Sequence, residues 1–141
     1  MTVSESNFKL RGIILVESTF KRVPDVVIDH GEKTETNFNV KSDSKDEKNL
    51  VTALIVKLVS KFEEKIKFEA EVTMVGLFEA ENATKEMIDS FGEINAPAII
   101  FPFIREHIIS LTIKGGLPPV ALPVVNFVPK ATDTPDTKTK N

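Results

Sequence analysis

The chain contains no cysteine, no tyrosine and no tryptophan among its 141 residues, and only two histidines. Without cysteine there is no disulfide framework, no thiolate nucleophile and no cysteine-based zinc site, which suits a reducing compartment. All ten aromatic residues are phenylalanine, so aromatic bulk is used without the polar group that tyrosine and tryptophan carry. These absences favour a protein that relies on apolar contacts rather than on redox or nucleophilic chemistry.

Basic stripes and long N-terminal apolar runs are also missing. The formal net charge is −3 and no basic stripe with interleaved aromatics occurs, so we expect no nucleic-acid partner. The longest apolar run near the N-terminus is Ile13 to Val16, which is far too short for a signal peptide or a membrane span. We therefore expect a cytoplasmic protein without membrane insertion.

Catalytic and metal-binding constellations find little support. His30 lies in DHGE and His107 in REHIIS, neither with a second histidine at zinc spacing. No serine lies in GxSxG, and Gly115–Gly116 lacks the rest of a phosphate loop. The paired carboxylates fall on expected strand and turn surfaces. We expect no enzyme, no metal and no cofactor.

Four segments have the alternation or β-branched content of strands. In the first, Phe8, Leu10, Ile14, Val16 and Phe20 are expected on one face and Ile13 and Leu15 on the other. The third also fits helical spacing, but its β-branched residues favour a strand. The fourth alternates most cleanly and is expected to have a wet face. The expected strands are Phe8–Lys21, Thr36–Ser42, Leu50–Phe62 and Ile66–Phe78.

Two helices should follow the strands. Asn82 or Thr84 can cap a short helix through about Phe91, with Gly92 at its C-terminal end. A longer helix is expected from Pro102 at its first position to Lys114, before two glycines. This order predicts an α+β fold, a four-stranded antiparallel meander with both helices on one side.

Such a fold leaves apolar surface uncovered, because two helices cover one side of the sheet while strands one and three are apolar on both. We therefore expect an oligomer, with a helical stripe at the interface formed by Ile104, Ile108 and Leu111. The expected organisation is a flexible N-terminus over residues 1–7, one domain over 8–128 and a disordered polar tail over 129–141.

The segment LPPVALPVVNFV, residues 117–128, is apolar, and its prolines prevent a helix or a central strand. Such a segment either caps its own core or lies exposed for a partner to bind. Its stiffness would suit the presentation of apolar side chains along one path. The sequence leaves both alternatives open.

The last third of the domain resembles SecB, the bacterial protein-export chaperone family. The matching motifs are Phe101-Pro102-Phe103, Arg105-Glu106, Lys114-Gly115, Pro118 and the closing Pro123-Val124-Val125-Asn126-Phe127. Glu71-Val72 and Gly76-Leu77-Phe78 match more diffusely, and the resemblance spans roughly residues 8 to 128. Family members usually carry a further helix after the closing motif, where this sequence has Pro129 and a polar tail.

The resemblance implies a dimer of dimers, a homotetramer with helices packed between sheets. It also implies a chaperone that holds unfolded preproteins without ATP and passes them to the SecA motor. Glu17 and Glu71 fall where the family docks SecA, although a second acidic position in strand one is Lys21 here. We expect client contacts at an aromatic and aliphatic set comprising Phe38, Val40, Phe103, Leu117, Val120, Leu122 and Val124.

Two other functions remain open. A SecB-like chaperone could instead be dedicated to one antitoxin of a toxin–antitoxin system. A carrier in which the apolar loop closes over a small apolar ligand belongs to a different class. Bound proteins recovered from cells would separate one client from many, and native mass spectrometry would reveal a bound lipid.

Overall fold

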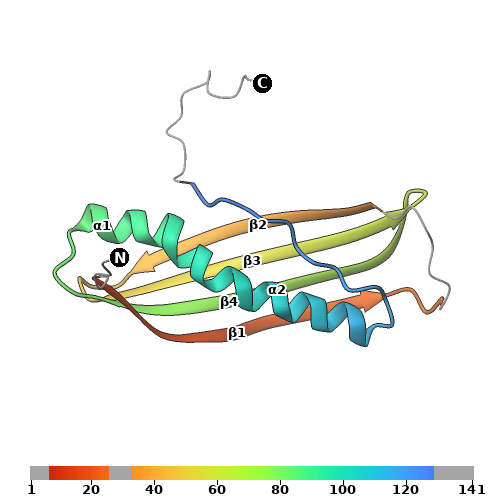
Figure 1. Cartoon of the computed structure of the whole chain (residues 1–141), viewed down its shortest axis with the longest axis horizontal. Helices are drawn as coiled ribbons and strands as arrows, with labels where there is room; N and C mark the ends of the chain where they lie inside the picture. Colours follow the sequence, from red (N-terminus) through yellow and green to blue (C-terminus); the bar gives the residue numbers. More distant parts are fainter. Residues whose placement is uncertain (1–6, 26–32, 129–141) are drawn as a thin grey trace, which may run out of the picture.

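A computed structural model of the chain describes residues 7–25 and 33–128 (Figure 1). They form a four-stranded sheet with a helical segment across one face. The expected α+β class, with a shorter and a longer helix on one side of an antiparallel sheet, is confirmed. The elements are β1 (Phe8–Arg22), β2 (Lys33–Ser44), β3 (Asn49–Phe62), β4 (Lys65–Ala80), α1 (Lys85–Ser90), η1 (Phe91–Asn95) and α2 (Ala96–Lys114).

Asn7, the first residue that the structure describes, contacts the segment that follows β4. Asn7 was expected in the flexible N-terminus, but its side-chain Nδ2 donates to the Glu81 carbonyl at 2.9 Å. The Glu81 N–H in turn donates to the Asn7 carbonyl at 2.8 Å. Asn7 is therefore fixed at the end of the sheet, whereas the expected tail 129–141 and His30 lie outside the described residues.

The strand order in the sheet is β1-β4-β3-β2, and every neighbouring pair is antiparallel. The predicted meander order is wrong in one detail, because β1 pairs with β4 and not with β2. This order places the two most apolar strands in the centre, where Leu54, Val56 and Val72 are fully buried. The more polar β2 lies at an edge, where charged side chains discourage pairing with other molecules.

Two bulges in β1, at Arg11 and Val16, change which side chains face the helix. The pairing with β4 shifts register at both places, and each extra residue moves the following side chains to the opposite face. Ile13 and Leu15 consequently face the helical layer, and Ile14 faces away, opposite Val75. The predicted grouping of Ile14 on one face with Leu10 and Phe20 is wrong for this reason.

The helical segment is continuous from Lys85 to Lys114. Thr84 caps its start as predicted, because its Oγ1 accepts a hydrogen bond from the Met87 N–H at 3.1 Å. Gly92 does not end a helix, since the chain continues through the π-helical turn η1. Glycine is needed there for packing: a Cβ at Gly92 would collide with the Ser42 side chain of β2.

The second helix begins at Ala96, well before the predicted start at Pro102, and Pro97 lies in its first turn. Pro102 is inside the helix and cannot donate to the carbonyl four residues earlier. That carbonyl belongs to Ala98, and both residues are exposed, so water can satisfy the unpaired oxygen.

The core lies between α2 and the central strands. Ile100, Ile104 and Ile108, spaced four residues apart, point at the sheet and are fully buried. Gly76 of β4 permits the close approach, because a Cβ there would lie 3.0 Å from the Ile100 Cδ1. By length and hydropathy alone, the helical segment Lys85–Lys114 could cross a membrane. Only 33% of its most apolar stretch of 18 residues is buried within the protein. Much of its apolar character therefore faces outward.

Residues 117–128 leave the end of α2 and cross the helix-covered face toward β2 (Figure 1). Gly116, with φ of +73°, makes the turn at a conformation that favours glycine. The Leu117 N–H donates to the Thr112 carbonyl at 2.9 Å, and the Val120 N–H donates to the Thr112 Oγ1 at 3.1 Å. The segment is thus held at one end by the last turn of α2.

Candidate functional site

An aromatic cluster forms where the crossing segment meets the edge strand. Phe38 of β2, Phe101 of α2 and Phe127 have ring centroids 6.1–6.5 Å apart. These spacings and tilted or edge-on geometries are favourable for aromatic pairs. A groove of about 520 Å³ opens beside the cluster. Its lining comes from β2, from Glu93 and from the end of the crossing segment: Phe38, Asn39, Val40, Lys41, Ser42, Glu93, Phe127 and Val128.

Two of the predicted client contacts, Phe38 and Val40, line this groove and are half-buried. Both lie on the face of β2 that carries the helical layer, paired with Val56 and Leu54 of β3. Their inner sides pack against the core, while their remaining surface faces the groove. The groove therefore combines apolar surface from Phe38 and Val40 with polar lining residues such as Lys41 and Glu93.

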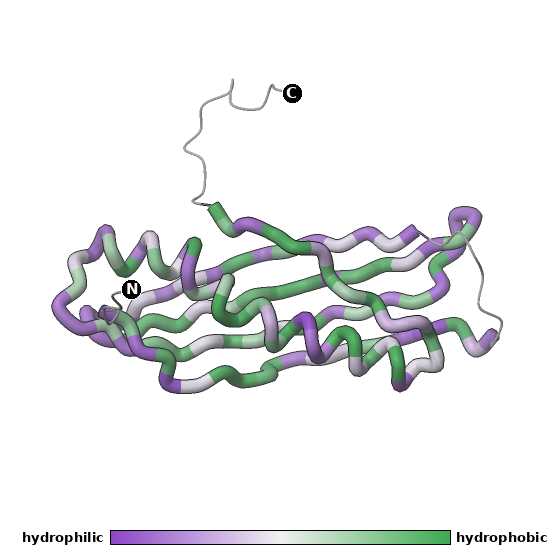
Figure 2. The backbone as a smooth tube through the Cα atoms, viewed as in Figure 1, coloured by the Kyte–Doolittle hydropathy of each residue, from purple (hydrophilic) through white to green (hydrophobic). Residues whose placement is uncertain are grey.

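The crossing segment divides the other predicted contacts between inside and outside. Leu122 is 2% exposed and belongs to the core, so the structure does not offer it to a client. Leu117 and Val120 are half-buried, and Val124 is 92% exposed. Figure 2 shows many hydrophobic positions along this segment, and a mixture of hydrophobic and hydrophilic positions along α2. The sequence left open whether this segment caps its own core or lies exposed. The structure shows both in part, since Leu122 is buried in the core and Val124 is exposed.

The outer face of α2 carries apolar residues that are exposed to solvent. Phe103 is 49% exposed, and Ile99 and Ile113 are exposed as well. Ile104 and Ile108, predicted at the subunit interface, instead point at the chain's own sheet and have no surface to offer a second subunit. The helical spacing that places these isoleucines on one face was predicted correctly, but that face packs on the chain's own sheet rather than on a second subunit.

The uncovered face of the sheet brings together the two predicted docking carboxylates. Glu17 lies opposite Thr73, and Glu71 lies opposite Thr19, so both side chains share this face. The Glu71 Oε1 is 4.0 Å from the Lys57 Nζ. Lys21 lies on the same face, opposite Glu69. The face is therefore mixed in charge rather than purely acidic.

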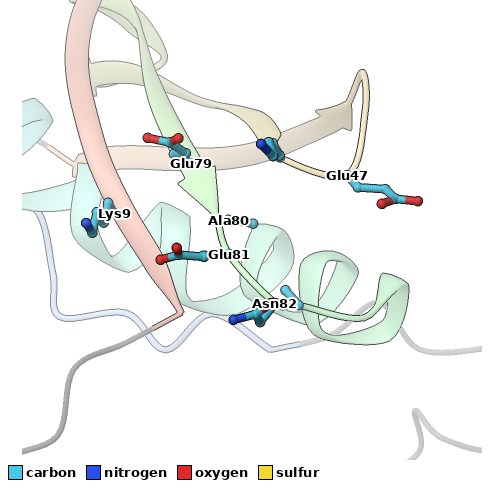
Figure 3. Close-up of a pocket in the computed structure, with 8 residues that line it drawn as sticks. Lys9, Glu47, Glu79, Ala80, Glu81 and Asn82 are labelled. Carbon is cyan, nitrogen blue, oxygen red and sulfur yellow. The ribbon is translucent and has the colours of Figure 1, made fainter.

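A second hollow lies at the end of the sheet, and Figure 3 shows that charged side chains surround it. Lys9 and Glu79 come from the β1–β4 pair, and Glu81 and Asn82 follow β4. Glu47 contributes a further carboxylate from the β2–β3 turn. This lining is unsuited to apolar segments, in contrast to the aromatic side chains at the groove beside Phe38.

One histidine contact joins the helix to the edge strand. The His107 Nε2 lies 2.8 Å from the Ser18 Oγ. Near the end of the same strand, the Arg22 Nη1 donates to the Gly115 carbonyl at 2.6 Å. Both contacts tie α2 to β1. Among residues 7–25 and 33–128 there is no group of three or more potential metal ligands.

Sequence reasoning missed three residues that shape the site. Phe101 and Phe127 complete the aromatic cluster, although both lie in the quoted motifs and could have been identified there. Thr112 is fully buried and holds the crossing segment. A lone threonine in an apolar helix carries no signal of such a role without coordinates.

Comparisons with known proteins agree with this architecture. Residues 20–129 match the sequence profile of the family described as SecB, preprotein translocase subunit SecB. The protein-export protein SecB of Magnetococcus marinus is 36% identical over 96 residues, which cover 67% of this chain and 61% of that protein. That of Methylobacillus flagellatus is 40% identical over 72 residues, covering 51% and 46% of the two chains.

The chain spans less than two thirds of the length of these relatives. A similar solved structure is a SecB-like chaperone of Mycobacterium tuberculosis in complex with a peptide from an antitoxin. The TM-score is 0.75 at 18% identity, and the match covers 85% of this chain and 91% of that one, which shows a shared fold. Because the family profile matches most of the sequence, the chain belongs to the SecB family.

Proposed function

We propose that this protein is an ATP-independent, cytoplasmic chaperone that binds unfolded preproteins and delivers them to the Sec export machinery. The observation that carries the proposal is the open groove in which Phe38, Val40 and Phe127 present apolar surface next to a proline-rich segment. Each client side chain buried there contributes about 1.5–3 kcal/mol before ordering costs. Binding the unfolded state lowers its free concentration and slows aggregation.

Substitutions at exposed apolar residues test this proposal without disturbing the core. Phe103→Asp and Val124→Asp should weaken the suppression of client aggregation, because both side chains are exposed. Phe103 lies on the helix that carries Phe101, and Val124 lies on the segment that carries Phe127. Ile66→Asp is the matched control, since Ile66 is 44% exposed but lies at the β3–β4 end. Light scattering of a diluted unfolded client gives the readout. Equal suppression by all variants would contradict the assignment.

The exposed apolar surface also supports self-association into a homotetramer, a dimer of dimers. Leu10, Ile14, Leu15 and Val16 on the edge strand β1 are each 45–61% exposed. Phe103 and Ile113 are also exposed, on the outer face of α2, and exposed apolar side chains in such number favour association. Several grooves on one assembly would add avidity for a long client through effective concentration.

SecA docking is proposed for the uncovered sheet face, through Glu17 and Glu71. Reversing both to lysine should weaken SecA binding at least about threefold at low salt, since exposed charge pairs are modest and screened. Glu35→Lys is the control, because Glu35 lies on the same face at the far edge, opposite Val59. Client binding should be unchanged. If Glu35→Lys weakened SecA binding as much as the double reversal, the assignment of SecA docking to Glu17 and Glu71 would be wrong.

A chaperone dedicated to one antitoxin is the second candidate, favoured by the fold shared with a SecB-like chaperone that holds an antitoxin peptide. The two candidates differ in client number. Proteins co-purified with the tagged chain from its own host would comprise many preproteins in the first case. One dominant small protein would support the second.

A further inference from the structure

The crossing segment, residues 117–128, lies on its own molecule as an extended peptide would. Its side chains alternate between inside and outside: Val120 and Leu122 point inward, and Ala121 and Pro123 are exposed. Such alternation is the period of an extended chain. After a shift at the exposed Val124, the half-buried positions resume with Val125 and Phe127. We call this segment the strap.

The strap occupies apolar positions that a client would otherwise fill. Leu122 is sealed in the core cluster, and Phe127 packs edge-on against Phe38 and Phe101. Phe38 and Phe127 both line the open groove, so the groove continues the path of the strap. An incoming apolar segment can reach the covered part only where the strap lifts.

The attachment of the strap depends on few polar contacts. Three of its residues are prolines, which have no N–H to donate. Its backbone donates from Leu117 and Val120, and both bonds go to Thr112. Thr112 is fully buried, and its hydroxyl also donates to the Ile108 carbonyl at 3.0 Å. Loss of this hydroxyl would leave the Val120 N–H without its acceptor in the closed state.

We infer that the strap is a resident occupant of the client groove and that Thr112 is the positioning residue that holds it closed. The inference rests on the proposed chaperone function. A client then competes with the strap, and its apparent dissociation constant is the intrinsic value divided by the fraction of molecules with the strap open. Weakening the strap should tighten client binding, which is opposite to the effect expected of an ordinary groove residue.

Thr112→Val tests the anchor, because valine keeps the shape of the buried side chain and removes the hydroxyl. Thr112→Ser keeps the hydroxyl and is the matched control. Hydrogen exchange of peptides covering the strap should rise in Thr112→Val and stay near the original rate in the control. Affinity for reduced, carboxymethylated lactalbumin should tighten about three- to tenfold in Thr112→Val, the size of one lost net hydrogen bond.

Leu122→Ala provides a second route to the same open state without touching Thr112, with Ile66→Ala, an exposed aliphatic residue outside the strap and the groove, as its control. It should also raise strap exchange and tighten client binding. Faster exchange with unchanged or weaker binding in both variants would overturn the competition. Unchanged exchange in Thr112→Val would overturn the anchoring role. Absence of binding by every protein, the original included, would overturn the proposed function and the competition with it.

Discussion

Truncation of the two apolar strap residues Leu122 and Val124 should change the stability of the protein by very different amounts, although they are only two positions apart. Leu122 is 2% exposed and Val124 is 92% exposed. Truncating a buried leucine to alanine costs about 2–5 kcal/mol, because transfer free energy is lost and a cavity remains. Truncating an exposed valine changes stability by about 0.5 kcal/mol or less. For a domain of this size, Leu122→Ala should lower the melting temperature by roughly 6–15 °C.

Local opening of the strap sets an upper limit on this loss. If the strap can detach while the sheet stays folded, destabilisation of the closed state cannot exceed the free energy that docks the strap. A loss below about 2 kcal/mol would therefore measure that docking free energy, provided that strap exchange rises as well. The size of the effect distinguishes a strap that unfolds with the domain from one that opens alone.

Urea denaturation followed by far-ultraviolet circular dichroism is the suitable assay, because the chain has no tyrosine or tryptophan to report by fluorescence. All proteins must be compared at one concentration, since the proposed self-association would make apparent stability depend on it. A Leu122→Ala value within about 0.5 kcal/mol of that for Val124→Ala would refute the buried placement of Leu122.

Three further variants test the framework around the site. Glu63 and Glu64 adopt φ of 52° and 70° in the β3–β4 turn, so Glu63→Asn with Glu64→Gly should stabilise the protein by about 1 kcal/mol, as seen in urea midpoints. Thr84→Ala should cost about 1 kcal/mol by removing the acceptor for the Met87 N–H, and an unchanged midpoint would contradict that cap. Gly76→Val should lower the melting temperature clearly, because its side chain would overlap with α2 and force about 1–3 kcal/mol of strain.

The spacing of apolar residues predicted the strands and helices, because each element buries one face and its apolar residues recur with the repeat of that element. The alternation of β4 and the four-residue spacing of Ile100, Ile104 and Ile108 both follow from one face meeting a core. The strand order did not follow, because local patterns do not reveal which strands pair. The bulges of β1 were missed for the same reason, as only the partner strand β4 defines the shift.

The helix boundaries show how tertiary contacts override local signals. Pro102 and Gly92 are ordinary markers of helix ends. Both lie within the helical segment here. Pro102 is tolerated because Ala98, whose carbonyl it cannot pair with, is exposed to water. Gly92 is present because β2 packs tightly against it, not because the helix ends there. The strap shows the same limit, since its composition could not distinguish the buried Leu122 from the exposed Val124.

The central claim is that apolar surface left over from folding first joins copies of this chain and then holds non-native chains. Size-exclusion chromatography with light scattering, with concentration read by refractive index, tests it most directly. The expected result is an oligomer alone, and a heavier complex after addition of an unfolded preprotein but not of its native form. A single subunit whose mass is unchanged by the unfolded client would contradict the claim.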